Sequence, residues 1–135
     1  SVDSERLAAA ISEEAVKKNI VQDILVEVNV AGEENKFGVT CEDASAFIEK
    51  IAQLKNIRIR GLMTSAPFVD NPEDNRKYFK QLKQLLVDIN QKNIDNVCMD
   101  VLSMGMTNDY TVAVEEGATH VRVGTAIFGA RDYSH

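Results

Sequence analysis

Hydrophobic positions along the chain alternate between two spacings. From Ser4 to about Asn19 they recur at helical spacing, and Ser4 can cap the helix. Residues 23–30 form a short run rich in β-branched side chains, which predicts a strand. The same analysis predicts helices at about 44–54, 72–89 and 108–116, and strands at about 57–64, 97–103 and 120–125. The chain therefore repeats a helix–strand unit four times.

Strict alternation of helix and strand predicts a parallel α/β sheet with right-handed crossovers. An open doubly wound sheet and part of a (β/α)8 barrel both fit this order. A complete barrel takes about 250 residues, and the chain has 135. In the first strand Ile24, Val26 and Val28 share one face, whereas Glu27 and Asn29 lie on the other. One polar face suits a barrel lumen, so we expect part of a TIM-type (β/α)8 barrel, with about four strands and four helices.

Composition narrows the range of partners. The formal net charge of -6 argues against a general nucleic-acid surface. No apolar run approaches the roughly 18 residues of a membrane span, so no membrane partner is expected. Only two histidines, and two cysteines at unrelated positions, Cys41 and Cys98, make a metal site improbable. Two separated thiols suit a reducing compartment, and we expect the cytoplasm.

Candidate chemistry gathers at the carboxyl ends of the last two strands, where parallel α/β folds bind ligands. Ser103 offers a hydroxyl, Gly105 allows close backbone approach, and the next helix would direct its N-terminal amides to the same place. Gly124 and Thr125 form a second small-residue turn. We therefore expect an anion site in these two loops, although an aspartate in the first turn of that helix counts against it.

Arg122 is expected on the inner face of the last strand, where an arginine is unusual for pure core; a strand-end arginine that reaches solvent is the alternative. Glu27 is interpreted as a paired or solvated strand-end carboxylate rather than a general base. Lys36 lies in a loop after two glutamates and is expected to be a solvated charge. Neither cysteine has a histidine nearby in sequence, so a Cys–His nucleophile has no support.

Several motifs occur in one order that is typical of a known family. They are Ser-Val-Asp-Ser at 1–4, Val-Asn at 28–29, Glu-Asn-Lys-Phe-Gly at 34–38, Gly-Leu-Met at 61–63, Leu-Ser-Met-Gly-Met at 102–106 and Val-Arg-Val-Gly-Thr-Ala-Ile-Phe-Gly at 121–129. Over its whole length the chain resembles the pyridoxal-phosphate homeostasis proteins, small relatives of the alanine racemase barrel. The last two motifs are specific in combination.

The resemblance implies a barrel that binds pyridoxal 5′-phosphate (PLP) at its C-terminal mouth. The implied cofactor-binding residues are Ser103, Gly105, Met106, Arg122, Gly124 and Thr125. By similarity, the hydroxyl at 103 and the turn at 124–125 hold the phosphate, and the guanidinium at 122 meets the pyridine nitrogen. The family is regarded as cofactor carriers or regulators without established enzymatic activity, so no catalytic residue is expected.

The resemblance also implies that residues 1–135 are the C-terminal half of the barrel domain. The family's Schiff-base lysine lies on the first barrel strand, which is absent here, and Lys36 does not match it. Binding of PLP by the half alone is therefore left open. Half a barrel leaves two strand edges unpaired, which predicts self-association or cover by a missing segment. Three other interpretations remain: a fragment of a PLP-dependent amino-acid racemase, a phosphate-binding barrel enzyme unrelated to PLP, and a truncated product without autonomous function.

Overall fold

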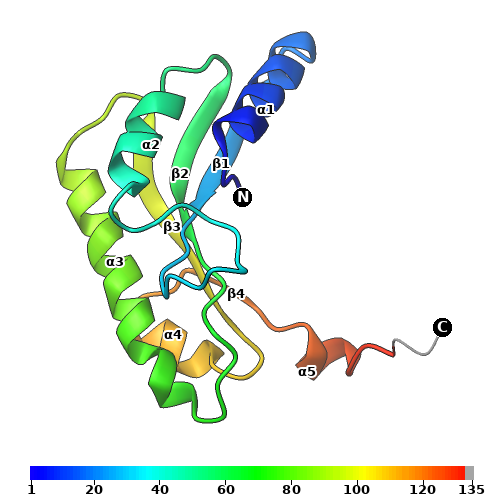
Figure 1. The fold of residues 1–135 in the computed structure, drawn as a ribbon. Coiled ribbons are helices and arrows are strands. Elements are labelled where there is room, and N and C mark those ends of the chain that lie inside the picture. The colour runs from blue at the N-terminus through cyan, green and yellow to red at the C-terminus, as the bar shows by residue number, and fades with distance from the viewer. Residues whose placement is uncertain (133–135) are drawn as a thin grey trace.

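Four parallel strands form a single sheet in the order β1-β2-β3-β4 in the computed structural model, which describes residues 1–132. The strands are β1 (Gln22–Glu27), β2 (Ile57–Met63), β3 (Val97–Met106) and β4 (His120–Arg122). Each strand pairs with its sequence neighbour, and the sheet curls into half of a barrel (Figure 1). The predicted parallel α/β class and its four strands are confirmed.

The helices of the repeating units pack on the outer face of the sheet. They are α1 (Glu5–Lys17), α2 (Ala44–Ile51), α3 (Arg76–Gln91, preceded by the 3-10 turn Pro72–Asn75) and α4 (Tyr110–Glu115). A short fifth helix, α5 (Thr125–Phe128), stands apart from the sheet near the C-terminus (Figure 1). The four predicted helices are present among residues 1–132, and α5 occupies a stretch whose first residue was expected to end the last strand.

Helix ends follow the sequence signals. The Ser4 hydroxyl accepts a hydrogen bond from the Leu7 amide at 3.2 Å, so Ser4 is the predicted cap. Asn71 caps the turn that begins at Pro72, accepting from the Glu73 amide at 3.1 Å. Gly117 follows the C-terminal end of α4 with a φ of +104°, a conformation that glycine adopts without strain.

The two faces of β1 differ in burial as their sequence predicts. Ile24, Val26 and Val28 face the helices and are almost fully buried. Leu25 and Glu27, on the inner face, are only half-buried. The core between sheet and helices is completed by the buried side chains of Ile48, Ile51, Ile59, Leu62, Phe79, Leu82, Ile89, Met99, Leu102 and Met104.

The inner face carries a row of paired charges toward the N-terminal ends of the strands. Arg58 Nε donates to Asp23 Oδ1 at 2.7 Å, and Arg60 bridges Asp23 to Asp100, reaching Asp100 Oδ2 at 2.5 Å. These guanidinium groups hold the pKa values of both aspartates below their ordinary range. The row links three strands.

The predicted ends of the last two strands were wrong. Strand β3 continues to Met106, three residues beyond the expected end, because Met106 pairs with Arg122 on β4. Strand β4 is correspondingly short and ends at Arg122, and the chain turns into α5 at Thr125. The small residues that suggested turns are thus partly strand and partly helix.

Both edges of the sheet are largely open within the described residues. At the β1 edge Val2 forms a parallel bridge to Val26; its amide donates to Leu25 O at 2.8 Å and its carbonyl accepts from the Glu27 amide at 2.9 Å. Val39 forms a second bridge, to Val28, and its amide donates to Glu27 O at 2.9 Å. Among residues 1–132 no helix combines the length and apolar character needed to cross a bilayer.

Candidate functional site

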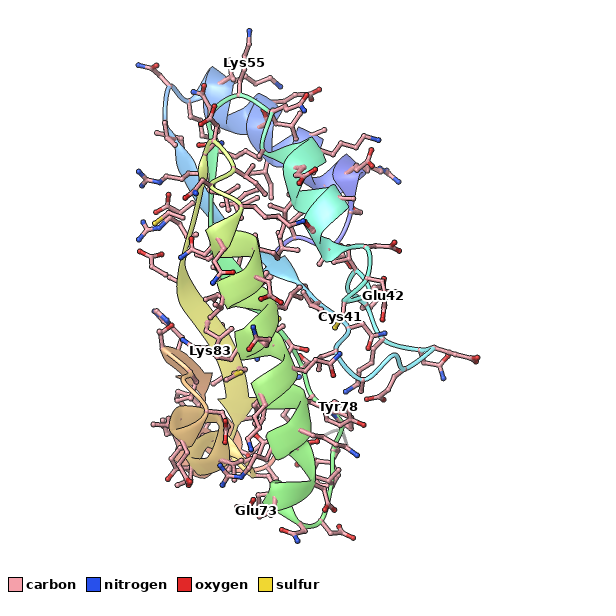
Figure 2. The ribbon with its side chains drawn as sticks, turned by 90° about the vertical axis from the view of Figure 1, so that its left-hand side faces the viewer. Cys41, Glu42, Lys55, Glu73, Tyr78 and Lys83 are labelled. Atoms are coloured by element: carbon pink, nitrogen blue, oxygen red, sulfur yellow. The ribbon has the colours of Figure 1, made fainter. Side chains whose placement is uncertain are left out.

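The carboxyl ends of the strands define one rim of the molecule, called the mouth below. Lys55 precedes β2 in the chain and Glu73 follows it, and Figure 2 shows these two residues at opposite ends of the molecule. The six predicted binding residues lie on the Glu73 side, at the end of β3 or between the end of β4 and the start of α5. Met106 and Arg122 are direct register partners.

Strand register places Ser103 and Arg122 on the same face. Ser103 pairs with Met63 on one side and His120 on the other, and Met63 pairs with Glu27. Residues paired across a parallel sheet point to the same side, and so do residues two apart along a strand. Arg122 therefore shares the inner face with this row, one step nearer the mouth.

The Arg122 guanidinium reaches from the end of β4 to the residue that follows β2. Its Nη2 donates to the Thr64 carbonyl at 2.6 Å, although 58 residues separate the two in sequence. Its Nε is buried and has no hydrogen-bond partner among residues 1–132. Burial lowers the pKa of Arg122, and the nearby carboxylates of Glu27 and Asp109 act in the opposite direction. The side chain is half-buried, which does not match the alternative of an arginine extended into solvent.

Gly105 serves a different contact from the expected one. Its φ is +99°, and a Cβ at this position would lie 2.6 Å from Ala113 Cβ and 3.1 Å from Tyr110 Cα. The close approach that needs glycine is therefore with α4, not with a ligand, because the strand here runs directly under the helix.

The start of α4 is an unfavourable place for an anion. Asp109 is buried, and its carboxylate accepts from the Met106 amide through Oδ1 and from Asn75 Nδ2 through Oδ2, each at 2.8 Å. The helix spans only six residues. A buried carboxylate at this point disfavours a second anion, which argues against phosphate binding by the α4 amides.

Gly124 and Thr125 instead open α5. A Cβ at Gly124 would meet no atom within 4 Å, and Thr125 is exposed, so the turn has space around it. The amide of Ala126 donates to the Thr107 hydroxyl at 3.3 Å, which ties α5 to the end of β3. Both loops predicted to form the site are therefore in contact.

Lys36 was expected to be solvated, and this was wrong. Its Nζ donates to the backbone carbonyls of Ser65 at 3.3 Å and Ala66 at 3.1 Å, and lies 3.4 Å from Glu33 Oε1. The lysine thus fastens the loop after β1 to the loop after β2. No local sequence signal marks these contacts, since the partners are backbone atoms about thirty residues away.

Two surface hollows lie elsewhere. One, of about 290 Å³, is lined by Ala10, Ile11, Ala15 and Ile20, and another lies on the opposite flank of α1. Both adjoin α1, and neither includes a residue of the mouth. Shape alone would therefore not have identified the candidate site; it rests on the contacts of Arg122 and the two loops.

Known proteins are similar to this chain in sequence. The chain is 48% identical over 133 residues to the pyridoxal phosphate homeostasis protein of Aquifex aeolicus, covering 98% of the chain and 58% of the relative. It is 41% identical to the protein of the same name from Pseudomonas aeruginosa, covering 98% of the chain and 55% of that protein. The chain therefore spans a little over half the length of these curated relatives.

Solved structures of related proteins have the same fold as this chain. PipY of Synechococcus elongatus, solved with PLP bound, superposes with a TM-score of 0.82 at 31% identity, covering 96% of this chain and 59% of PipY. More distant enzymes, such as alanine racemase from Corynebacterium glutamicum (TM-score 0.65, 13% identity), share the fold alone. The family model described as "Alanine racemase, N-terminal domain" matches residues 1–132. The chain is thus half of a TIM-type barrel, and it belongs to the family of the alanine racemase N-terminal domain.

Proposed function

We propose that this chain carries the phosphate and ring-nitrogen side of a PLP site and forms part of a protein of intracellular PLP homeostasis. The observation that carries the proposal is Arg122, whose guanidinium is fixed to the Thr64 carbonyl while its buried Nε remains without a partner. An unpaired buried donor is costly, and a pyridine nitrogen at the mouth would accept from it. The printed names of the relatives and the PLP-bound PipY structure support the same cofactor.

The residues present fit this group. The Ser103 hydroxyl, the open turn at Gly124 and the exposed Thr125 hydroxyl would hold the phosphate, and Arg122 would face the ring. Bound PLP supplies an aldehyde and an electron-withdrawing ring. Gly105 and Met106 would contribute by shaping the end of β3, since Gly105 packs under α4 and the Met106 amide is held by Asp109.

Arg122 also bears on the kind of chemistry. A guanidinium stays protonated even where burial lowers its pKa. A permanent cation beside the pyridine nitrogen keeps that nitrogen unprotonated, which weakens the ring as an electron sink. We infer a cofactor carrier or regulator rather than an enzyme of amino-acid transformation. The relatives' names describe homeostasis and state no reaction.

We further infer that residues 1–135 are the second half of the barrel domain. In (β/α)8 barrels a phosphate site is frequently formed by the loops after the last two strands, and here the candidate loops follow β3 and β4. The lysine that the family uses to hold PLP covalently would then lie outside this chain. Two unpaired thiols far apart in sequence support a cytoplasmic setting.

Binding is tested with pyridoxine 5′-phosphate, which has no aldehyde and needs no lysine. Titration of the ¹⁵N-labelled chain should shift the amide signals of Ser103, Arg122 and Thr125, and Arg122→Ala should abolish the shifts. Ser103→Ala combined with Thr125→Val should weaken binding by about tenfold or more, since a hydrogen bond to a charged group contributes about 1.5–3 kcal/mol. If no signal shifts at ligand concentrations up to about 10 mM, the binding free energy is weaker than about −3 kcal/mol. That result would refute the site. The whole protein with PLP should then show no turnover of any amino acid.

We propose that the isolated chain also self-associates through its open edges. Strand β4 has only three residues, and beyond it Ile127 and Phe128 are 70% and 86% exposed. Light scattering during gel filtration should show dimers or larger species that Phe128→Asp disperses. Phe68→Asp, which removes an equally exposed phenylalanine far from that edge in sequence, is the control. A monomer at every concentration would overturn this proposal.

A further inference from the structure

Thr64 joins all four strands at the mouth. It is fully buried and follows the last residue of β2. Its hydroxyl donates to Val28 O beyond β1 at 2.6 Å, its amide donates to Ser103 O on β3 at 3.1 Å, and its carbonyl accepts from Arg122 Nη2 on β4 at 2.6 Å. Each polar group of this one residue therefore contacts a different chain segment, so its orientation is fixed from three sides.

The loop that follows Thr64 is held in the same manner. The carbonyls of residues 65 and 66 accept from Lys36, the carbonyl of Pro67 accepts from Asn75 Nδ2 at 2.8 Å, and that of Val69 accepts from Asn108 Nδ2 at 2.7 Å. Side chains from the loops after β1 and β3 and from the turn before α3 thus secure segment 64–69. A carbonyl at its first residue cannot swing freely, because the backbone is tethered on both sides.

Asn75 adds a buried link to the β3 side. It is fully buried, and its Nδ2 donates both to the Pro67 carbonyl and to Asp109, whose carboxylate also holds the Met106 amide. Since Met106 is the register partner of Arg122, segment 64–69 and the end of β3 beside Arg122 are connected through these hydrogen bonds.

We propose that Thr64 is a positioning residue for Arg122, an inference that rests on the proposed function. The hydroxyl bond to Val28 O fixes the Thr64 backbone, and the fixed carbonyl engages one guanidinium nitrogen. The guanidinium is then held in one orientation, with Nη2 occupied and Nε left for the ligand ring. A planar guanidinium held at one corner can present its remaining donors in a defined direction.

The test compares Thr64→Val, which has nearly the same shape without the hydroxyl, with Thr64→Ser, which keeps it. Two ligands are used: pyridoxine 5′-phosphate, and benzyl phosphate, which keeps the phosphate and an aromatic ring but lacks the ring nitrogen. Thr64→Val should weaken pyridoxine 5′-phosphate by about three- to tenfold, the range of one hydrogen bond, and leave benzyl phosphate unchanged. Thr64→Ser, which keeps the hydroxyl, should restore the wild-type difference in affinity between pyridoxine 5′-phosphate and benzyl phosphate. Thr111→Val, at an exposed threonine on α4, should change the affinity for neither ligand.

A ligand-free measurement separates this inference from the function on which it rests. In the ¹H–¹⁵N spectrum the Nε–Hε signal of Arg122, identified by its loss in Arg122→Ala, should move or broaden in Thr64→Val and not in Thr111→Val. An unchanged Nε–Hε signal, or equal weakening of both phosphates, would overturn the positioning role. If the signal responds but wild type binds neither phosphate, Thr64 still orients Arg122 and the PLP proposal fails.

Discussion

Gly61 provides the sharpest test of how the sheet is packed. It lies in the middle of β2, paired with Leu25 on one side and Val101 on the other. A Cβ at this position would lie 1.7 Å from Val101 O and 2.6 Å from Val101 C, whereas ordinary contact begins near 3.4 Å. Both obstacles are backbone atoms of the adjacent strand. Gly61→Ala therefore requires β2 and β3 to separate locally.

The size of the effect follows from the required displacement. Relieving the contact takes 3.4 − 1.7 = 1.7 Å, which is about a third of the roughly 4.8 Å between neighbouring strands. Such a shift breaks the adjacent ladder bonds, each worth about 0.5–1.5 kcal/mol net. Two or three lost bonds give a destabilisation of about 3 kcal/mol, a large fraction of the roughly 5–15 kcal/mol that holds a domain folded.

Thermal unfolding followed by circular dichroism measures this directly. A loss of about 3 kcal/mol should lower the midpoint by about 10 °C in a domain of this size. Gly124→Ala is the matched control, because its φ of −80° is ordinary and no atom lies within 4 Å of the added Cβ. A Gly61→Ala midpoint within about 3 °C of wild type, less than about 1 kcal/mol, would refute the packing of β2 against β3.

Three further substitutions probe charges and buried ties. Asp23 and Asp100 have folded pKa values below their ordinary value of 3.8, so their contribution to stability is present above that pH and is lost as the pH falls below it; Asp100→Asn should flatten this acid loss in urea titrations. Lys36→Met should speed hydrogen exchange in the loops after β1 and β2, leaving α3 protected. Asp109→Asn replaces one of two buried acceptors by a donor and should cost about 1–3 kcal/mol of unfolding free energy.

Each of these has its own control. If Asp100→Asn and wild type unfold identically in acid, the charge row on the inner face does not contribute to the stability of the fold. Lys17→Met, at an exposed helix pair, should leave exchange in both loops unchanged. Asp70→Asn, an exposed aspartate in the loop before α3, should unfold like wild type; an equal effect at Asp70 and Asp109 would contradict the buried role of Asp109.

Much of the candidate site could be located from sequence, but its internal contacts could not. Small residues and an arginine at the ends of consecutive strands were sufficient to place Ser103, Arg122 and Thr125 at one rim, because parallel strands end on the same side. The contact made by Gly105 could not be predicted. A glycine that admits a ligand and one that admits a helix have the same local sequence, and only the position of α4 distinguishes them.

The chain's own pattern determined the order of elements, the caps at Ser4 and Asn71 and the inner and outer faces of β1, since each depends on residues close together in sequence. The tertiary structure alone decided that Arg122 reaches Thr64, 58 residues away, and that Lys36 reaches the carbonyl of Ala66, 30 residues away. Those contacts join side chains to backbone carbonyls, which every residue possesses. Their partners are selected by how the sheet curls and where the loops close, and no residue type in the sequence records that choice.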